Sequence, residues 1–161
     1  MEIRRAQMKD ISRIEEIYAY ARKQMKKNGN PTQWGDDRPR REDVIHDIET
    51  SAGYVVEEEG RICGVFMFYV GEEPDYKVIE DGRWKNDLPY GVIHWVASDG
   101  SGKGILGAIV KYCSSIITNL RIDTHQDNHI MQHVLEKNGF ERCGIVYVED
   151  GSPRIAYQRT V

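Results

Sequence analysis

Residues 128–140 of the chain read Asn128-His129-Ile130-Met131-Gln132-His133-Val134-Leu135-Glu136-Lys137-Asn138-Gly139-Phe140. The apolar spacing predicts a helix over 130–138, which Asn128 can cap and Gly139 can end. Two strands are expected after it, over 140–148 and 154–159, around the turn Asp150-Gly151. The stretch therefore predicts a short helix that feeds a pair of antiparallel strands.

A loop with glycines at positions 100, 102 and 104 lies upstream of this stretch. It follows a predicted strand over 90–97 and opens a predicted helix over 104–119. A strand that ends in glycines and opens a helix presents backbone N–H groups and the positive end of the helix dipole, so we expect an anion site. The loop is not a P-loop, because that motif needs Gly where Ala97 stands and Ser or Thr where Gly104 stands.

A dinucleotide site is the nearest alternative for this loop. Residues 102–107 match the pattern GxGxxG, and Asp123 follows about 20 residues later. However, residues 98–101 separate the glycines from the strand, and too few strand–helix units remain downstream for that fold. An NAD(P)-dependent oxidoreductase is therefore a less favoured function for this chain.

Taken together, Val92 to Phe140 resembles the GCN5-related N-acetyltransferase (GNAT) superfamily. The resemblance depends on the strand, the glycine loop and the later spacing of Asn128, Met131, Val134, Leu135, Lys137 and Gly139-Phe140. It implies an acetyl-CoA-dependent N-acetyltransferase that acts on a primary amine of a small molecule or peptide by direct attack in a ternary complex. A non-catalytic acyl-CoA-binding or sensing domain on the same fold is the alternative.

The resemblance also implies where acetyl-CoA binds. The pyrophosphate would contact the backbone of Ser101, Gly102, Lys103, Gly104, Ile105, Leu106 and Gly107. The pantetheine arm would lie along His94, Trp95 and Val96, and Asn128, Met131 and Lys137 would complete the site. Two positions depart from the family pattern: Ser101 replaces Arg or Gln, and Leu106 replaces Gly or Ala. Binding through backbone N–H groups tolerates both changes.

Several side chains are candidates for proton transfer. Period-two alternation places Asp123 and His125 on one face of a predicted strand, and His94 lies on the neighbouring strand. Asp123 matches a position where some family members carry an acidic base. The family's tyrosine acid is replaced by Leu135, so Tyr147, Tyr90 and Cys143 are candidate substitutes, and transfer without a dedicated acid is the alternative. An ordinary structural role remains open for each of these residues.

The segment from Asn30 to Asp37 is a predicted loop where related enzymes form one wall of the acceptor cleft. Trp34 could stack on a substrate, and Asp36 could hold an ammonium group. An ordinary surface loop with one anchoring aromatic side chain is the alternative.

The remaining pattern predicts a mixed α/β domain. A strand over 3–6, helices after Asp10 and over 41–50, and a hairpin over 53–70 precede a polar segment, 71–89, that we expect to be a long exposed connection. The expected fold is one domain over residues 1–161, with a largely antiparallel central sheet of six to seven strands flanked by about four helices.

Composition limits the function classes. The chain has 161 residues with a formal net charge of -4, which argues against general nucleic-acid binding. No stretch approaches the ~18 apolar residues of a membrane span, and we expect a cytoplasmic protein. Its three cysteines lack the spacing of a metal site, so we predict reduced thiols and no metal. Exposed hairpin strands leave a homodimer open.

Overall fold

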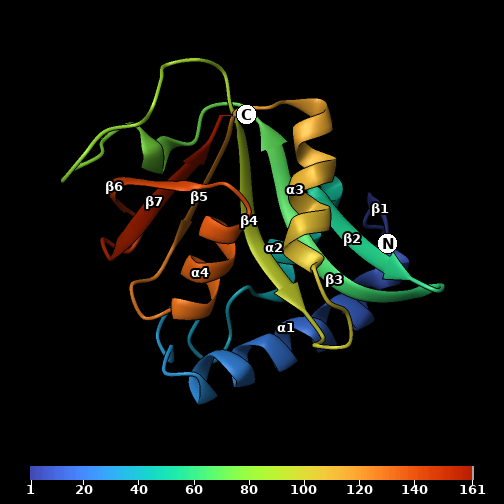
Figure 1. The fold of residues 1–161 in the computed structure, drawn as a ribbon. Helices are drawn as coiled ribbons and strands as arrows, with labels where there is room; N and C mark the ends of the chain where they lie inside the picture. Colours follow the sequence, from blue (N-terminus) through green and yellow to red (C-terminus); the bar gives the residue numbers. More distant parts are fainter. Residues whose placement is uncertain (161) are drawn as a thin grey trace.

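The computed structural model describes residues 1–160, in which all strands belong to one seven-stranded sheet with helices on both faces (Figure 1). The strands are β1 (Glu2–Arg5), β2 (Gly53–Glu58), β3 (Arg61–Val70), β4 (Gly91–Ser98), β5 (Leu120–Thr124), β6 (Glu141–Tyr147) and β7 (Pro153–Arg159). The helices are α1 (Ile11–Lys27), α2 (Arg41–Glu49), α3 (Ile105–Ile116) and α4 (His129–Lys137), with two short 3-10 turns, η1 (Met8–Asp10) and η2 (Pro74–Tyr76). The predicted fold class is confirmed.

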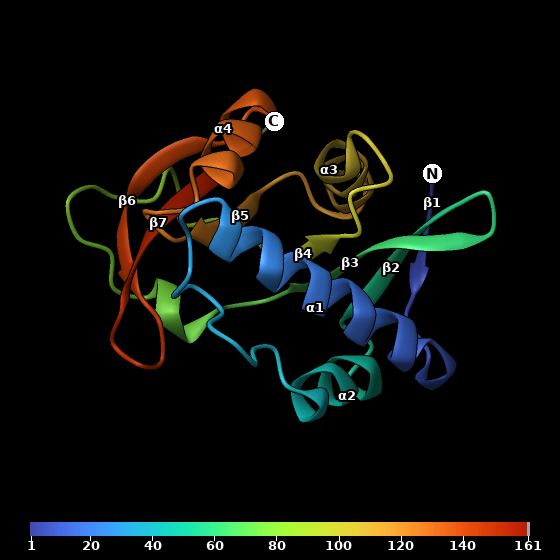
Figure 2. The same ribbon diagram turned by 90° about the horizontal axis from the view of Figure 1, so that it is seen from below.

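The strand order is β1-β2-β3-β4-β5-β7-β6, and each neighbouring pair is antiparallel except β4 and β5. Helices α3 and α4 cover one face of the sheet, and α1 and α2 cover the other (Figure 2). Alternation along β2 supplies both cores, since Val55 packs on the α1 side and Val56 on the α3 side. Both valines have no exposed surface.

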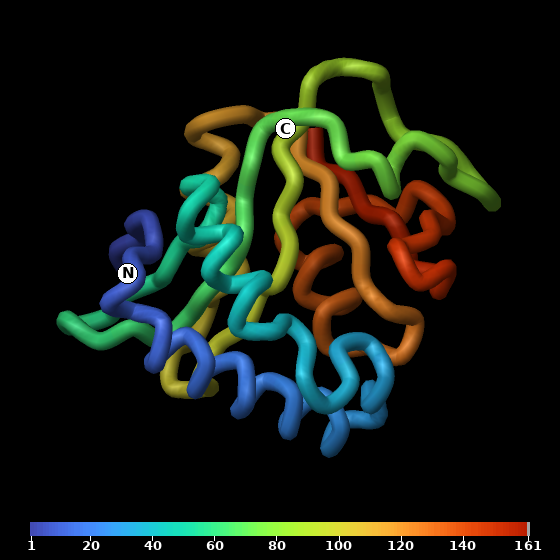
Figure 3. Tube along the Cα trace, turned by 180° about the vertical axis from the view of Figure 1, so that it is seen from behind, coloured from blue at the N-terminus to red at the C-terminus, as the bar shows by residue number. Residues whose placement is uncertain are grey.

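The parallel pair β4–β5 is joined only at its start. Its ladder has two pairs, Gly91 with Leu120 and Val92 with Arg121. Beyond them the two strands diverge toward the loop over 28–40, as the trace in Figure 3 shows. The backbone edge of β4 after Val92 therefore has no β5 ladder beside it.

A β-bulge lies in β4 at the point of divergence. Met67 of β3 pairs with His94 and Val65 pairs with Ala97, so Trp95 and Val96 together oppose one β3 residue. Trp95 has a φ of 56°, in the left-handed region, and its carbonyl oxygen accepts a hydrogen bond from the Tyr18 hydroxyl at 2.8 Å. A side chain of helix α1 thus binds the backbone of the bulge.

The prediction that residues 71–89 form an exposed connection is wrong in part. Tyr76 is 2% exposed, and the Trp84 ring packs against the Arg121 guanidinium at 4.2 Å from its centroid. An isolated bridge between Glu80 and Ile145 ties the segment to β6. Aromatic side chains in a polar stretch therefore anchor it over β5 and β7.

Candidate active site

A pocket of about 320 Å³ lies where β4 and β5 separate. Val96, Ile122 and Met131 line it from the core beside α3 and α4. Trp34 and Trp95 line it from the core beside α1 and α2. Because its walls come from both faces, the pocket runs through the gap in the sheet.

The glycine loop leads into α3 with the geometry of an anion site. Gly104 is the N-cap of α3 and has a φ of 71°. Ala108 is the first residue of the described helix whose amide donates back along the chain, to the Gly104 carbonyl oxygen. The amides before it are free of the helix ladder, as at any helix N-terminus.

The two atypical loop residues do not obstruct this surface. Leu106 is 6% exposed and packs in the core beneath α3, so its bulk is directed away from the loop. Ser101 donates from its amide and from its hydroxyl to Asp99 Oδ1, at 2.9 and 2.5 Å. Lys103 is exposed. The Ser101 amide is therefore already paired within the loop, and the amides at the start of α3 are the backbone donors available to a ligand.

Within the pocket, one histidine side chain lies between two carboxylates. His94 Nε2 is 3.6 Å from Glu73 Oε2, and His94 Nδ1 is 3.8 Å from Asp123 Oδ2. The Tyr76 hydroxyl donates to Asp123 Oδ2 at 2.7 Å, and the Tyr69 hydroxyl donates to Glu73. Glu73, His94 and Asp123 all line the pocket.

The surroundings shift the pKa values of this cluster. Burial alone would lower the pKa of His94, but the nearby carboxylates of Glu73 and Asp123 outweigh it and raise that pKa. Burial alone would raise the pKa of Glu73, but the nearby His94 imidazole and the hydrogen bond from the Tyr69 hydroxyl bring it to about 2. The cluster therefore favours a protonated imidazole beside ionised Glu73.

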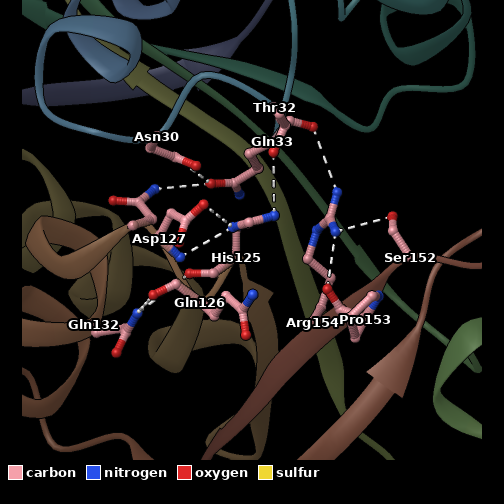
Figure 4. A network of polar contacts seen from close by, with 11 residues as sticks. Asn30, Thr32, Gln33, His125, Gln126, Asp127, Gln132, Ser152, Pro153 and Arg154 are labelled. Atoms are coloured by element: carbon pink, nitrogen blue, oxygen red, sulfur yellow. Dashed lines mark hydrogen bonds and ion pairs between the residues drawn. The ribbon is translucent and has the colours of Figure 1, made fainter.

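His125, predicted as a base, has a polar partner at each ring nitrogen in the structure. Its Nδ1 accepts from the Asp127 amide at 3.0 Å, and its Nε2 lies 3.4 Å from the Thr32 hydroxyl (Figure 4). With Nδ1 accepting, Nε2 carries the proton and donates it to Thr32. Burial and the nearby Arg154 lower the pKa of His125. Both ring nitrogens thus have partners and the ring does not line the pocket, so the geometry lends no support to the role as a base, which stays a prediction.

Asn128 joins the turn before α4 to the loop over 28–40. Its Oδ1 accepts from the Met131 amide at 3.0 Å, which confirms the predicted helix cap. Its Nδ2 donates to Gln33 Oε1 at 3.0 Å, and Asn30 donates to the same oxygen at 2.8 Å. Asn128 and Met131 line the pocket, whereas Lys137 is exposed at the far end of α4.

Two further predicted site residues lie outside the pocket. Tyr147 is 42% exposed on edge strand β6, and its hydroxyl donates to Glu80 Oε2 at 3.0 Å. Asp36 is 84% exposed and forms an ion pair with Lys26. Neither residue lines the pocket, so its geometry lends no support to the two predicted roles, which stay predictions. Trp34 does line the pocket, where its ring packs against Trp95.

Several residues that line the pocket were not predicted from the sequence: Glu73, Asp75, Thr124, Glu149 and Asp150. Glu73 and Asp75 belong to the segment assigned to solvent, and the last two lie in the β6–β7 turn. The aromatic residues at 76, 84 and 90 were the available signal, since large rings in a polar stretch indicate a packed segment.

Comparisons with known structures agree with this architecture. The chain is 30% identical to an acetyltransferase of the GNAT family from Streptococcus agalactiae, with a TM-score of 0.90 over 99% of this chain and 95% of that one. A ribosomal-protein-alanine N-acetyltransferase from Brucella melitensis shares the fold at 16% identity and a TM-score of 0.65, with all of both chains covered. So does AAC(6')-Ib in complex with paromomycin and acetyl-CoA, at 21% identity and 0.64, over 98% of this chain and 92% of that one. No protein-family model and no curated protein matches the sequence.

Proposed function

Because the chain belongs to the GNAT family of acetyltransferases, we propose that it transfers an acetyl group from acetyl-CoA to a primary amine of a small molecule or peptide. The amine attacks directly, within a ternary complex. The observation that carries this proposal is the pocket through the β4–β5 gap, which connects the β4 edge to the cluster around His94. Acetyl-CoA bound on one face of the sheet and an acceptor amine bound on the other can meet in this pocket.

The residues present suit acetyl-CoA. The free amides at the start of α3 suit its pyrophosphate, and the unpaired edge of β4 at His94, Trp95 and Val96 suits an extended arm with amide groups. Asn128 and Met131 border the same space. AAC(6')-Ib, which shares the fold, has been solved with acetyl-CoA and with coenzyme A. Bound acetyl-CoA would supply an activated thioester.

We assign proton removal from the amine to the Asp123–His94 pair. An imidazole whose pKa is raised above 6.5 is a well-matched base at neutral to slightly alkaline pH. Tyr76 and Glu73 hold the two partners in place. The departing thiol has an ordinary pKa of ~8.5, so the thiolate leaves without a dedicated acid.

Two measurements test this function. Calorimetric titration with acetyl-CoA, CoA and NAD should give binding for the first two only. Release of free thiol from acetyl-CoA should depend on an added primary amine. Binding of CoA with no turnover against any amine would favour the sensing domain instead, and tight binding of NAD without CoA would overturn both functions.

A further inference from the structure

Strand β5 carries a buried arginine on the face that bears Asp123. Arg121 is 5% exposed and lies two residues before Asp123, so strand alternation directs both side chains to one face of the sheet. Within residues 1–160, its Nε has no hydrogen-bond partner and its guanidinium forms no ion pair with a carboxylate. A buried charge without a counter-ion is costly unless other groups stabilise it.

The groups that stabilise this guanidinium all belong to residues 71–90. Its central carbon lies 4.2 Å from the centroid of the Trp84 ring and 3.9 Å from the centroid of the Tyr90 ring. Its Nη2 donates to the Asn86 carbonyl oxygen at 2.8 Å. A cation is attracted to the faces of aromatic rings, most strongly where water is excluded. Arg121 therefore fastens this segment to β5.

The first of the two rings leads from Arg121 to Asp123. Trp84 Nε1 donates to the Tyr76 carbonyl oxygen at 2.9 Å, and the two rings pack with centroids 5.1 Å apart. The hydroxyl of Tyr76 is the group that donates to Asp123 Oδ2. The position of the Tyr76 backbone thus decides whether its hydroxyl reaches the carboxylate.

The second ring leads from Arg121 to His94. The Tyr90 hydroxyl accepts a hydrogen bond from the Glu73 amide at 2.9 Å. The Glu73 side chain is held separately by the Tyr69 hydroxyl and lies 3.6 Å from His94 Nε2. The Tyr90 hydroxyl therefore fixes the backbone of the residue whose carboxylate faces the imidazole.

We propose that Arg121 is a positioning residue for the proposed reaction. Through its two aromatic partners it fixes the backbone at Glu73 and at Tyr76. It thereby sets the contacts that these two residues make with His94 and Asp123. The kinetic consequence rests on the proposed function, whereas the effect on the imidazole itself can be measured without turnover.

The sign of the effect separates positioning from a direct effect of charge. The titratable and charged groups around His94 are Asp47 of α2, Tyr69 of β3, Glu73, Asp75 and Tyr76 of residues 71–90, and Asp123 of β5, and the same pocket is lined by Arg38, Glu149, Asp150 and Arg154. Removal of a nearby positive charge raises the pKa of an imidazole. Displacement of the carboxylates beside it lowers that pKa.

The test is an NMR titration of the His94 ring in two variants of Arg121, with His94→Gln to identify the resonance. Arg121→Met removes the charge and keeps a long apolar side chain, whereas Arg121→Lys keeps the charge and loses the planar group. We expect Arg121→Met to lower the pKa of His94 by about one unit, the size expected when an opposite charge moves away. Arg121→Lys should lower it by less.

Tyr90→Phe tests the second ring separately and decides the question if the Arg121 variants do not fold. It keeps a ring beside the guanidinium and removes the hydroxyl that accepts from the Glu73 amide. The pKa of His94 should fall as it does in Arg121→Met. Ile79→Val is the matched control, because Ile79 packs in the same aromatic cluster and touches neither ring's hydrogen bond to the backbone. It should leave the pKa of His94 unchanged, and thermal unfolding checks that each variant is folded.

A pKa of His94 that rises or stays in place in folded Arg121→Met and Tyr90→Phe would overturn the proposal, as would an equal fall in Ile79→Val. In an active enzyme the pH midpoint of kcat/KM should move with the measured pKa, while the affinity for CoA stays within twofold. Absence of thiol release with every amine would remove the acetyltransferase function and leave the positioning role to be decided by the titration. Turnover with an unshifted pKa in the variants would do the reverse.

Discussion

At the scale of single residues, His94 is the group whose protonation connects the electrostatics of the pocket to its chemistry. It lies between the carboxylates of Glu73 and Asp123, which raise its pKa above the ordinary value of 6.5. Only the neutral imidazole can accept a proton from an incoming amine. Its raised pKa therefore sets the pH below which turnover declines.

We expect kcat/KM to fall as pH is lowered through the raised pKa of His94, with the midpoint above pH 6.5. Asp123→Asn removes one of the charges that raise this pKa. The midpoint should move to lower pH, and the plateau should drop by roughly 10²-fold or more. Initial rates of thiol release between pH 6 and 9 measure both effects.

Asp87→Asn is the matched control for this series, because Asp87 is an exposed carboxylate that does not line the pocket. Its pH profile should match that of the unmodified protein. A midpoint that stays in place in Asp123→Asn would show that His94 is not the group that titrates.

Glu73 predicts a second pH effect, on stability. Its pKa is about 2 in the folded protein against 4.5 in the unfolded chain. The stabilisation is present above about pH 4.5 and is lost as pH falls toward 2, on the order of 2 kcal/mol. Urea unfolding between pH 6 and 3 should show this decline, reduced in Glu73→Gln and unchanged in Glu72→Gln. An equal decline in both variants would assign the loss to other carboxylates.

At the scale of elements, the sequence predicted most of the fold because its signals are local. Strand β5 has the predicted bounds, and α3 ends three residues before the predicted limit, at Ile116. Apolar periodicity, caps and turn glycines act within one element, so one sequence is enough to recognise them. No such local signal marks the bulge at Trp95, because the bulge results from pairing with β3 and from the hydrogen bond that the Tyr18 hydroxyl donates to the Trp95 carbonyl oxygen.

The glycine loop gives a prediction at this scale. Gly104 has a φ of 71°, and an added Cβ would meet no atom within 4 Å, so Gly104→Ala should cost about 1–2 kcal/mol from backbone strain alone. We expect CoA affinity to fall about tenfold, because relief of the strain changes the direction of the loop amides. Calorimetry and urea unfolding measure the two effects.

Gly107→Ala is the control within the same helix. The added Cβ would meet Asn138 Oδ1 at 3.3 Å, and φ at this position lies outside the left-handed region. Alanine is the better helix former by about 1 kcal/mol, so stability should hold or rise while CoA affinity stays within a few fold. Unchanged CoA affinity in Gly104→Ala would mean that the left-handed cap does not shape the site.

At the scale of the whole molecule, the site depends on segments that sequence patterns do not bring together. Asp123 and His94 could be placed on neighbouring strands from the resemblance and from alternation. Asp75 and Glu149 could not, because they reach the pocket only through the packing of residues 71–90 over β5 and the β6–β7 turn. The contact between His125 and Thr32 could not be predicted for the same reason, since Thr32 comes from a loop 93 residues away.

The same architecture predicts the kinetic mechanism. The cysteines at 63, 113 and 143 are all buried, and none lines the pocket described within residues 1–160. No thiol is therefore placed to take the acetyl group before the amine arrives, and both substrates must be present in the pocket together. Double-reciprocal plots should intersect, and acetyl-CoA alone should leave the mass of the protein unchanged. Parallel plots with an acetylated protein would instead require a nucleophile in the pocket, and a direct attack through the β4–β5 gap would no longer hold.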